Sequence, residues 1–124
     1  MKAKQGELTT PETGPPLADG SGVHLDKPIY TLSVASEILE THPRTLMMYE
    51  HLNMIKPRRT ATNRRRYSQR DLMKLQAIQT LTRKHGVNLA GVRYILALLK
   101  TLQLSGLEPP DELKQVYDLY EEII

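Results

Sequence analysis

Arginine residues gather in one short segment of the chain, with no acid among them. Five of the nine positions from 58 to 66 are arginines: Arg58, Arg59, Arg64, Arg65 and Arg66. From Pro43 to Arg70 the chain has eight Lys or Arg residues and one acid, Glu50, although its total excess of positive charge is only +3. Such a local excess favours a polyanionic partner. The chemistry that these residues predict is therefore phosphate binding.

The residues before the arginines predict two short helices that could dock on a DNA groove. Ser33 can cap a first helix over Val34–Glu40, whose apolar face would consist of Val34, Ala35, Ile38 and Leu39. Pro43 suits the first position of a second helix over residues 43–52, and Asn53 suits its left-handed end. Two short helices joined by so short a turn are the minimal helix-turn-helix pattern.

The arginine-rich segment itself predicts a β-hairpin that projects from the core. Thr60, Thr62 and Asn63 are turn formers, so we expect strands over residues 56–60 and 64–67. The segment has too few apolar residues for a core hairpin, and a hairpin that follows a helix-turn-helix is a wing. Ile29–Leu32 has the β-branched and aromatic content of a further, very short strand.

Two longer amphipathic helices are predicted after the wing. Ser68 and Asp71 match a capping box, and the helix that they open should run to about His85 and end at Gly86. Asn88 can cap the next helix, over Leu89–Leu104, whose apolar face is broader than one small domain would cover. That breadth indicates contact with a partner.

A short acidic helix is predicted at the C-terminal end, after Pro109 and Pro110. An isolated helix of about 14 residues is marginal in water, so it must pack on something, and a second copy of the chain is the simplest candidate. Its apolar stripe supplies the predicted dimerisation residues Leu113, Val116, Tyr117, Tyr120 and Ile123.

The expected fold is mainly α: a winged helix-turn-helix with a small β-hairpin wing, two following helices and a short C-terminal dimerisation helix. Residues 1–28 are rich in Pro and Gly and poor in large apolar groups, which predicts a disordered tail. We expect the DNA-binding domain to cover residues 29–104 and the C-terminal helix to lie within residues 105–124.

Several classes of function are disfavoured by composition. Cysteine is absent, which removes disulfides and thiolate metal sites, and the four histidines share no metal-ligand spacing. No nucleophile–base pair, paired acids or phosphate-cradling Gly loop is evident, so we expect no enzyme activity, metal or cofactor. No apolar run approaches the ~20 residues that span a bilayer, and no secretory signal is recognisable. We therefore expect a cytoplasmic protein.

The order of these elements, and the residues in them, resemble the MerR family of bacterial transcription regulators. The resemblance covers Ile29–Leu99 and is carried by HPRTLMMYEHLNMIKPRRT in the second helix and its exit and by NRRRYSQRDLMKLQAIQTL in the wing and third helix. GVNLAGVRYIL is similar to the junction of the HspR-like heat-shock repressor branch. The chain departs from the family at three positions. The family usually has Arg at the position of Met47, and it often has another Arg at the position of His51 and Gly at that of Asn53.

The resemblance implies a homodimer that binds an inverted repeat in double-stranded DNA upstream of chaperone genes and represses them. It also implies the DnaK chaperone as a partner that favours repression. The absence of cysteine and of room for a sensor domain agrees with a signal that arrives through a protein partner or through stability.

Each residue of the basic segment has an expected role. Arg44 could pair with a guanine edge, Thr45 could bind a base or a phosphate, and Met48 could contact a thymine methyl group, while one of Met47 and Met48 would fill the core. Tyr49 or Tyr67, which could contact phosphates, could instead be a core residue with its hydroxyl at the rim. The expected phosphate contacts are Tyr49, Arg58, Arg64, Arg65, Arg66 and Tyr67.

Three alternatives to a heat-shock repressor stay open at this point. The chain could be a MerR-type activator or repressor of another regulon. It could be an excisionase-like accessory protein that bends DNA, although excisionases seldom carry two further amphipathic helices. It could also be a protein-interaction module whose acidic C-terminal helix docks on a partner.

Overall fold

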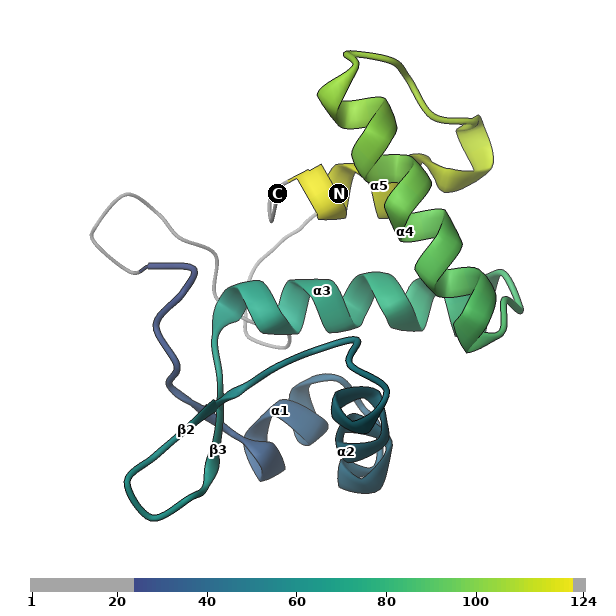
Figure 1. Ribbon diagram of the computed structural model, residues 1–124. Helices are drawn as coiled ribbons and strands as arrows, with labels where there is room; N and C mark the ends of the chain where they lie inside the picture. The colour runs from purple at the N-terminus through teal and green to yellow at the C-terminus, as the bar shows by residue number, and fades with distance from the viewer. Residues whose placement is uncertain (1–23, 122–124) are drawn as a thin grey trace, which may run out of the picture. The chain divides into compact units, whose positions relative to one another are not determined.

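The computed structural model describes residues 24–121 (Figure 1). Its elements in chain order are β1 (Tyr30–Thr31), α1 (Leu32–Ile38), α2 (Pro43–His51), β2 (Arg58–Arg59), β3 (Arg65–Tyr67), α3 (Gln69–Gln79), the π-helical turn η1 (Thr80–Lys84), α4 (Leu89–Leu104), the 3₁₀ turn η2 (Asp111–Leu113) and α5 (Lys114–Glu121). The chain divides into two compact units between Leu72 and Met73, inside α3, whereas the sequence predicted a boundary after Leu104.

The first helix begins two residues earlier than the sequence predicted. Thr31, not Ser33, is its N-cap, because the Thr31 Oγ1 accepts a hydrogen bond of 3.1 Å from the backbone N–H of Val34. The predicted apolar face is confirmed at Ala35 and Leu39, which are buried, but the Val34 side chain is exposed. A cap at Thr31 lets the chain pass directly from β1 into α1.

The second helix begins at Pro43, as predicted, with His42 as its N-cap. The His42 Nδ1 accepts a hydrogen bond of 3.0 Å from the backbone N–H of Arg44. At the other end Asn53 has a φ of 62°, and the Met54 N–H bonds the carbonyl of Tyr49. A left-handed residue after the helix end, together with this hydrogen bond back to the last turn, is a Schellman motif, so Asn53 has the predicted role.

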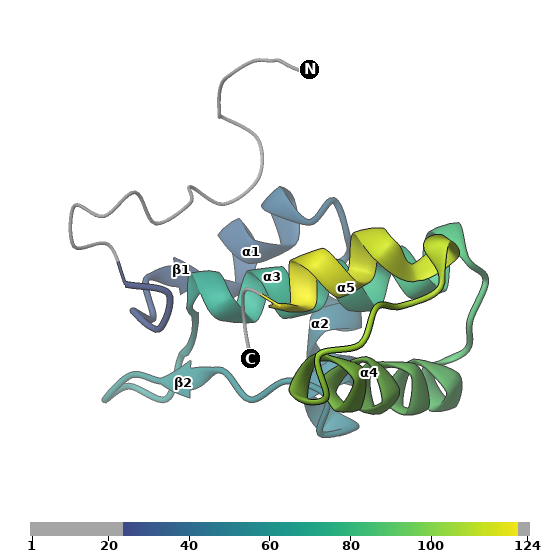
Figure 2. The ribbon, with the colours of Figure 1, turned by 90° about the horizontal axis from the view of Figure 1, so that it is seen from above.

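The wing is part of a three-stranded antiparallel sheet in the order β1-β3-β2. Tyr30 lies opposite Tyr67, and Arg58 and Arg59 lie opposite Arg66 and Arg65. The turn is closed by a hydrogen bond from the Asn63 N–H to the Thr60 carbonyl, and Asn63 then adopts a φ of 65°. The tip of this hairpin extends away from α2 (Figures 1 and 2). The predicted wing is confirmed, with β1 as its third strand.

The predicted capping box opens α3. The Ser68 N–H donates to the Asp71 Oδ2 at 2.9 Å, and the Asp71 N–H donates to the Ser68 Oγ at 3.0 Å. Near this start, Leu25 and Asp26 both bind Arg70, one through its carbonyl and one through its carboxylate. The predicted tail therefore concerns mainly residues 1–23, which lie outside the described residues.

The GVNLAGV junction has a specific geometry in the second unit. Gly86 has a φ of 65°, which ends the helical run of α3 and η1, and the Asn88 side chain accepts a hydrogen bond of 2.8 Å from the Gly91 N–H to cap α4. A Cβ on Gly91 would lie 2.7 Å from the Val87 Cγ1. Both glycines are thus needed, one for its backbone angle and the other for its lack of a side chain.

The C-terminal helix packs on α4 of the same chain, and the two run alongside each other in Figure 2. The Gln103 Nε2 donates to the Tyr117 carbonyl at 3.0 Å, and the Tyr117 hydroxyl donates to the Leu107 carbonyl at 2.9 Å. Among the predicted dimerisation residues, Val116 and Tyr117 are buried by this packing, Leu113 and Tyr120 are half-buried, and Ile123 lies outside the described residues.

Candidate nucleic-acid interface

Helix α2 presents one continuous exposed face. Arg44, Met47, Met48 and His51 are exposed, and Thr45 is half-buried beside them. The spacing i, i+3, i+4, i+7 places the four exposed residues on the same side of the helix. The prediction that one of the two methionines fills the core is wrong, because Met47 is 41% and Met48 44% exposed. Both methionines therefore extend the surface that Arg44 begins.

The sheet register sorts the wing arginines into two sets. Residues directly opposite one another share a face of the sheet, and neighbours along a strand alternate between faces. Arg59 and Arg65 therefore lie on the same face as the buried Tyr67, whereas Arg58 and Arg66 lie on the other. The sequence pattern alone did not distinguish these two sets.

We call Arg59 and Arg65 the inner set and Arg58 and Arg66 the outer set. Glu50 of α2 binds both arginines of the inner set. The Arg65 Nε donates to the Glu50 Oε1 at 2.6 Å, and the Arg59 Nη2 donates to the Glu50 Oε2 at 3.1 Å. Partial burial raises the pKa of this carboxyl, but the hydrogen bonds and charges of Arg65 and Arg59 outweigh burial, so the net effect is a lowered pKa. The carboxylate thus links α2 to both strands of the hairpin.

The outer set and the hairpin tip present the remaining positive charge. Arg58 and Arg64 are exposed and Arg66 is half-buried, with its Nη1 donating to the Arg65 carbonyl at 3.0 Å. A hollow of about 410 Å³ lies where this part of the wing meets the start of α1. It is lined by Thr31, Leu32, Ser33, Asn63, Arg64, Arg65 and Arg66. Guanidinium, hydroxyl and amide donors at one concave site suit a phosphate group.

The two tyrosines of the predicted phosphate set are core residues. Tyr67 has no exposed surface, its hydroxyl has no hydrogen-bond partner within residues 24–121, and burial raises the pKa of Tyr67 to about 12. A phosphate contact from Tyr67 is therefore excluded in this conformation. Tyr49 is also buried. The alternative interpretation of both as core residues agrees with their burial, but the Tyr67 hydroxyl is buried too and does not lie at the rim.

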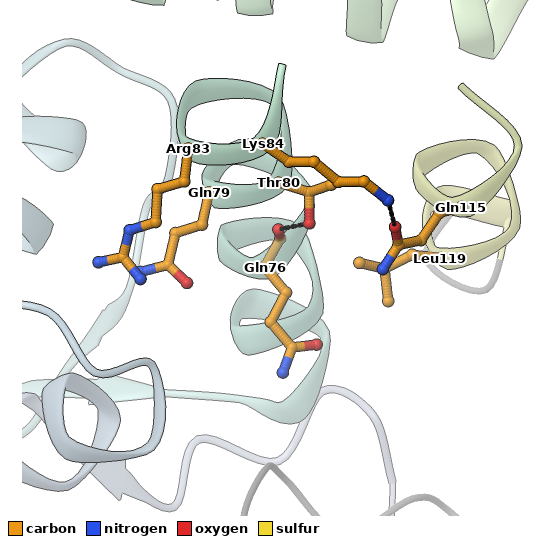
Figure 3. Close-up of a pocket in the computed structure, with 7 residues that line it drawn as sticks. All are labelled: Gln76, Gln79, Thr80, Arg83, Lys84, Gln115 and Leu119. Carbon is orange, nitrogen blue, oxygen red and sulfur yellow. Dashed lines mark hydrogen bonds between the residues drawn. The ribbon is translucent and has the colours of Figure 1, made fainter. Parts of the chain in front are cut away.

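A second hollow, of about 590 Å³, lies within the other unit (Figure 3). It is lined by Gln76, Gln79, Thr80, Arg83, Lys84, Gln115 and Leu119. The Lys84 Nζ donates to the Gln115 Oε1 at 2.9 Å and so joins η1 to α5, while the Thr80 hydroxyl donates to the Gln76 carbonyl. The side chains of this lining include no acid. Across residues 24–121, no three His, Asp or Glu side chains lie close enough together to hold a metal ion.

The same part of the chain contains no helix that is long and apolar enough to cross a membrane. The exposed residues of α2 and the outer arginines of the wing together form the candidate site.

A model of the MerR HTH family of regulatory proteins matches residues 30–99, which are more than half of the chain and include α2 and the whole wing. The chain belongs to the MerR family. The resemblance that the sequence motifs carried is confirmed by this match, and the matched range ends within α4.

Two kinds of relative are similar to this MerR chain. A Streptomyces coelicolor protein described as a heat shock protein HspR is 44% identical over 73 residues, which are 59% of this chain and 48% of the relative. The HTH-type transcriptional regulator GlnR of Bacillus anthracis is 30% identical over 89 residues, which are 72% of this chain and 67% of the regulator. GlnR of Bacillus cereus gives the same values. The chain thus spans about half the length of the HspR relative.

Sequence reasoning missed two features of this MerR site. The helical pattern places Tyr49 or Glu50 on or near the inward side of the second helix, but the position of Glu50 facing Arg59 and Arg65 follows from the fold of the wing onto α2. Ser33 was assigned to a helix cap, whereas it lines the hollow beside Arg64. The unbalanced charge of five neighbouring arginines was the signal that a counter-charge was needed.

Proposed function

We propose that this MerR-family chain is a sequence-specific DNA-binding transcriptional repressor of heat-shock or chaperone genes that binds an inverted repeat as a homodimer. The observation that carries the DNA-binding part is the link between α2 and the wing through Glu50. A helix with an exposed face and a basic hairpin held at a fixed position beside it suit a DNA groove and its flanking backbone.

In this proposal α2 of each subunit enters the major groove, where base edges carry a distinct pattern of donors, acceptors and methyl groups. Arg44 pairs with a guanine edge, Thr45 bonds a base or a phosphate, and Met47 and Met48 contact thymine methyl groups. Met47 and His51 stand where the family usually has arginines, and the loss of that pair shifts the preferred half-site toward the thymine-containing steps that Met47 and Met48 contact.

The wing binds the DNA backbone in this proposal. Arg58, Arg64 and Arg66 contact phosphates, with Ser33 and the start of α1 forming the other wall of the hollow beside them. Arg65 and Arg59 act indirectly, because their guanidinium groups hold the hairpin against Glu50. Of the predicted DNA contacts, Arg65 therefore becomes a positioning residue, and the buried Tyr49 and Tyr67 are not DNA contacts.

The heat-shock assignment is supported by the HspR relative and by the GVNLAGV junction. Repression, a DnaK-type chaperone as co-repressor, and a cytoplasmic, nucleoid-associated location belong to this proposal and come from the resemblance. The GlnR relatives favour a second candidate, a MerR-type regulator of another regulon. Mapping where the chain binds in its native genome decides between them: sites upstream of chaperone genes support the first candidate, and their absence supports the second.

An unbiased selection of bound DNA duplexes by the full chain tests the proposal. We expect the selected sequences to share an inverted repeat, which would establish both specificity and a two-fold binder. A variant with Arg44, Arg65 and Arg66 changed to Ala should lose this binding. The matched control changes Lys74, Lys84 and Lys114 to Ala, which removes the same charge from the other unit. Full binding by the triple arginine variant would contradict both the repressor and the regulator proposals.

A further inference from the structure

Helix α4 carries a stripe of large apolar side chains that nothing within residues 24–121 covers. Tyr94 is 72%, Leu98 63% and Leu104 73% exposed, and Leu107, just beyond the helix, is 56% exposed. Along the helix these residues follow a spacing near i, i+4, i+10, and the smaller exposed residues Ala90, Ala97 and Thr101 fill the gaps between them on the same side. We call Tyr94, Leu98 and Leu104, with these smaller residues, the α4 stripe.

The opposite side of the helix already has a use. Val92, Leu96 and Leu99 are buried, and α5 contacts α4 within the same unit. The stripe is thus a second apolar face and not the edge of the core. Contiguous exposed apolar surface on a folded domain marks a site of protein contact when polar residues border it.

Charges at the two ends of the stripe differ in sign. Arg93 lies beside the stripe near the start of α4, and the exposed acids Glu108, Asp111 and Glu112 follow its end. The start of the helix also carries the positive end of the helix dipole. A parallel pair of stripes would place like charges together, whereas an antiparallel pair places the acids of one copy beside Arg93 of the other.

We propose that the α4 stripe is the docking surface for a second copy of this chain, which packs on it in the antiparallel direction. A two-fold axis at the level of Leu99 would place Leu98 close to the partner subunit's Leu98 and Tyr94 against the partner subunit's Leu104. Glu108 would then approach the partner subunit's Arg93. This inference rests on the homodimer of the proposed function and names its surface.

The sequence predicted a different dimerisation surface, the apolar stripe of the C-terminal helix. Val116 and Tyr117 are occupied inside their own chain, and the Tyr117 hydroxyl is bonded to the Leu107 carbonyl. Exposing these two residues for a partner would open the unit, whereas the α4 stripe is available without any rearrangement.

Sedimentation of the full chain without DNA tests the proposal through the dimer dissociation constant. We expect Leu98→Glu to weaken the dimer by about tenfold or more, because two unpaired carboxylates would be buried near the two-fold axis. The matched control is Ile29→Glu, which places the same charge on an apolar residue that is 49% exposed in the other unit, and it should leave the dimer unchanged. Since Leu98 is mostly exposed in the single chain, the variant should keep the urea midpoint of the dissociated wild type.

A charge exchange tests the antiparallel direction. Arg93→Glu should weaken the dimer several-fold, and adding Glu108→Arg to the same chain should restore most of the loss. A wild-type chain that stays monomeric at its solubility limit, or a Leu98→Glu variant with a dissociation constant within twofold of wild type, would overturn the docking surface.

Binding of a single half-site duplex separates this inference from the proposed function. If the Leu98→Glu variant dimerises normally and still binds the half-site, the docking surface is wrong and the DNA-binding proposal stands. If the variant is monomeric and neither chain binds any duplex, the docking surface stands and the proposed function is wrong.

Discussion

Neutralising Glu50 is the most informative single change, because one carboxylate holds two arginines of the wing. Glu50→Gln keeps the size of the side chain but removes its charge. The Arg65 side chain is 22% and the Arg59 side chain 38% exposed, so water screens both pairs and the Arg59 pair most. Exposed pairs contribute 0–1 kcal/mol and charge-assisted bonds somewhat more, so we expect unfolding by urea to show a loss of about 1 kcal/mol.

Glu50→Gln should strengthen non-specific DNA binding and lower the preference for the specific sequence. Releasing Arg59 and Arg65 adds positive charge at the interface, which should strengthen binding to random duplex at low salt. The wing would then be less firmly positioned, so the ratio of specific to non-specific affinity, measured by fluorescence anisotropy, should fall several-fold. Glu37→Gln, on the exposed side of α1, makes the same change in net charge and serves as the control.

The stability difference between wild type and Glu50→Gln should also depend on pH. The carboxyl pKa is lowered in the folded chain from an ordinary value of 4.5, so its contribution is fully present above that value and is lost as the pH falls through the folded-state value. We expect the two urea midpoints to converge below pH 4.5. A Glu50→Gln variant that matches Glu37→Gln in stability, pH dependence and specificity ratio would refute the positioning role of Glu50.

Three further substitutions test other parts of the structure. Tyr67→Phe removes a buried hydroxyl that lacks a partner within residues 24–121, so thermal unfolding should show equal or higher stability, and DNA affinity should stay within about twofold; a large loss of affinity would restore Tyr67 as a DNA contact. Gly91→Ala should cost about 1–3 kcal/mol in urea unfolding, because the new Cβ meets Val87; an unchanged midpoint would show that the junction has room. Gly86→Ala should cost about 1–2 kcal/mol through its left-handed backbone, and a stabilised variant would contradict that reason.

The features that sequence predicted well are those determined by neighbouring residues. Pro43, Asn53 and Asn88 have the terminal roles that their chemistry suggests, and the Ser68–Asp71 capping box forms with both of its hydrogen bonds. These signals act within one helical turn, so no knowledge of the fold is needed to use them.

The features that it predicted poorly depend on residues far apart in the chain. Thr31 displaced Ser33 as a helix cap because β1 pairs with β3 and so fixes where α1 can begin. The burial of Tyr67 and the pairing of Arg65 follow from the sheet register and the approach of α2, which periodicity does not reveal. Likewise, the sequence predicted amphipathic faces in both C-terminal helices, but only their packing decides which face is left exposed.

The salt dependence of DNA binding tests the central claim most directly. In each subunit, Arg44, Arg58, Arg64 and Arg66 lie on the α2 and wing surface without an ion pair to Glu50. If Arg58, Arg64 and Arg66 neutralise phosphates in both subunits while Arg44 pairs with a base edge, the log–log slope of affinity against salt for the selected duplex should be roughly −5, at ~0.9 per contact. A slope shallower than about −3 would contradict the wing as a clamp on the DNA backbone.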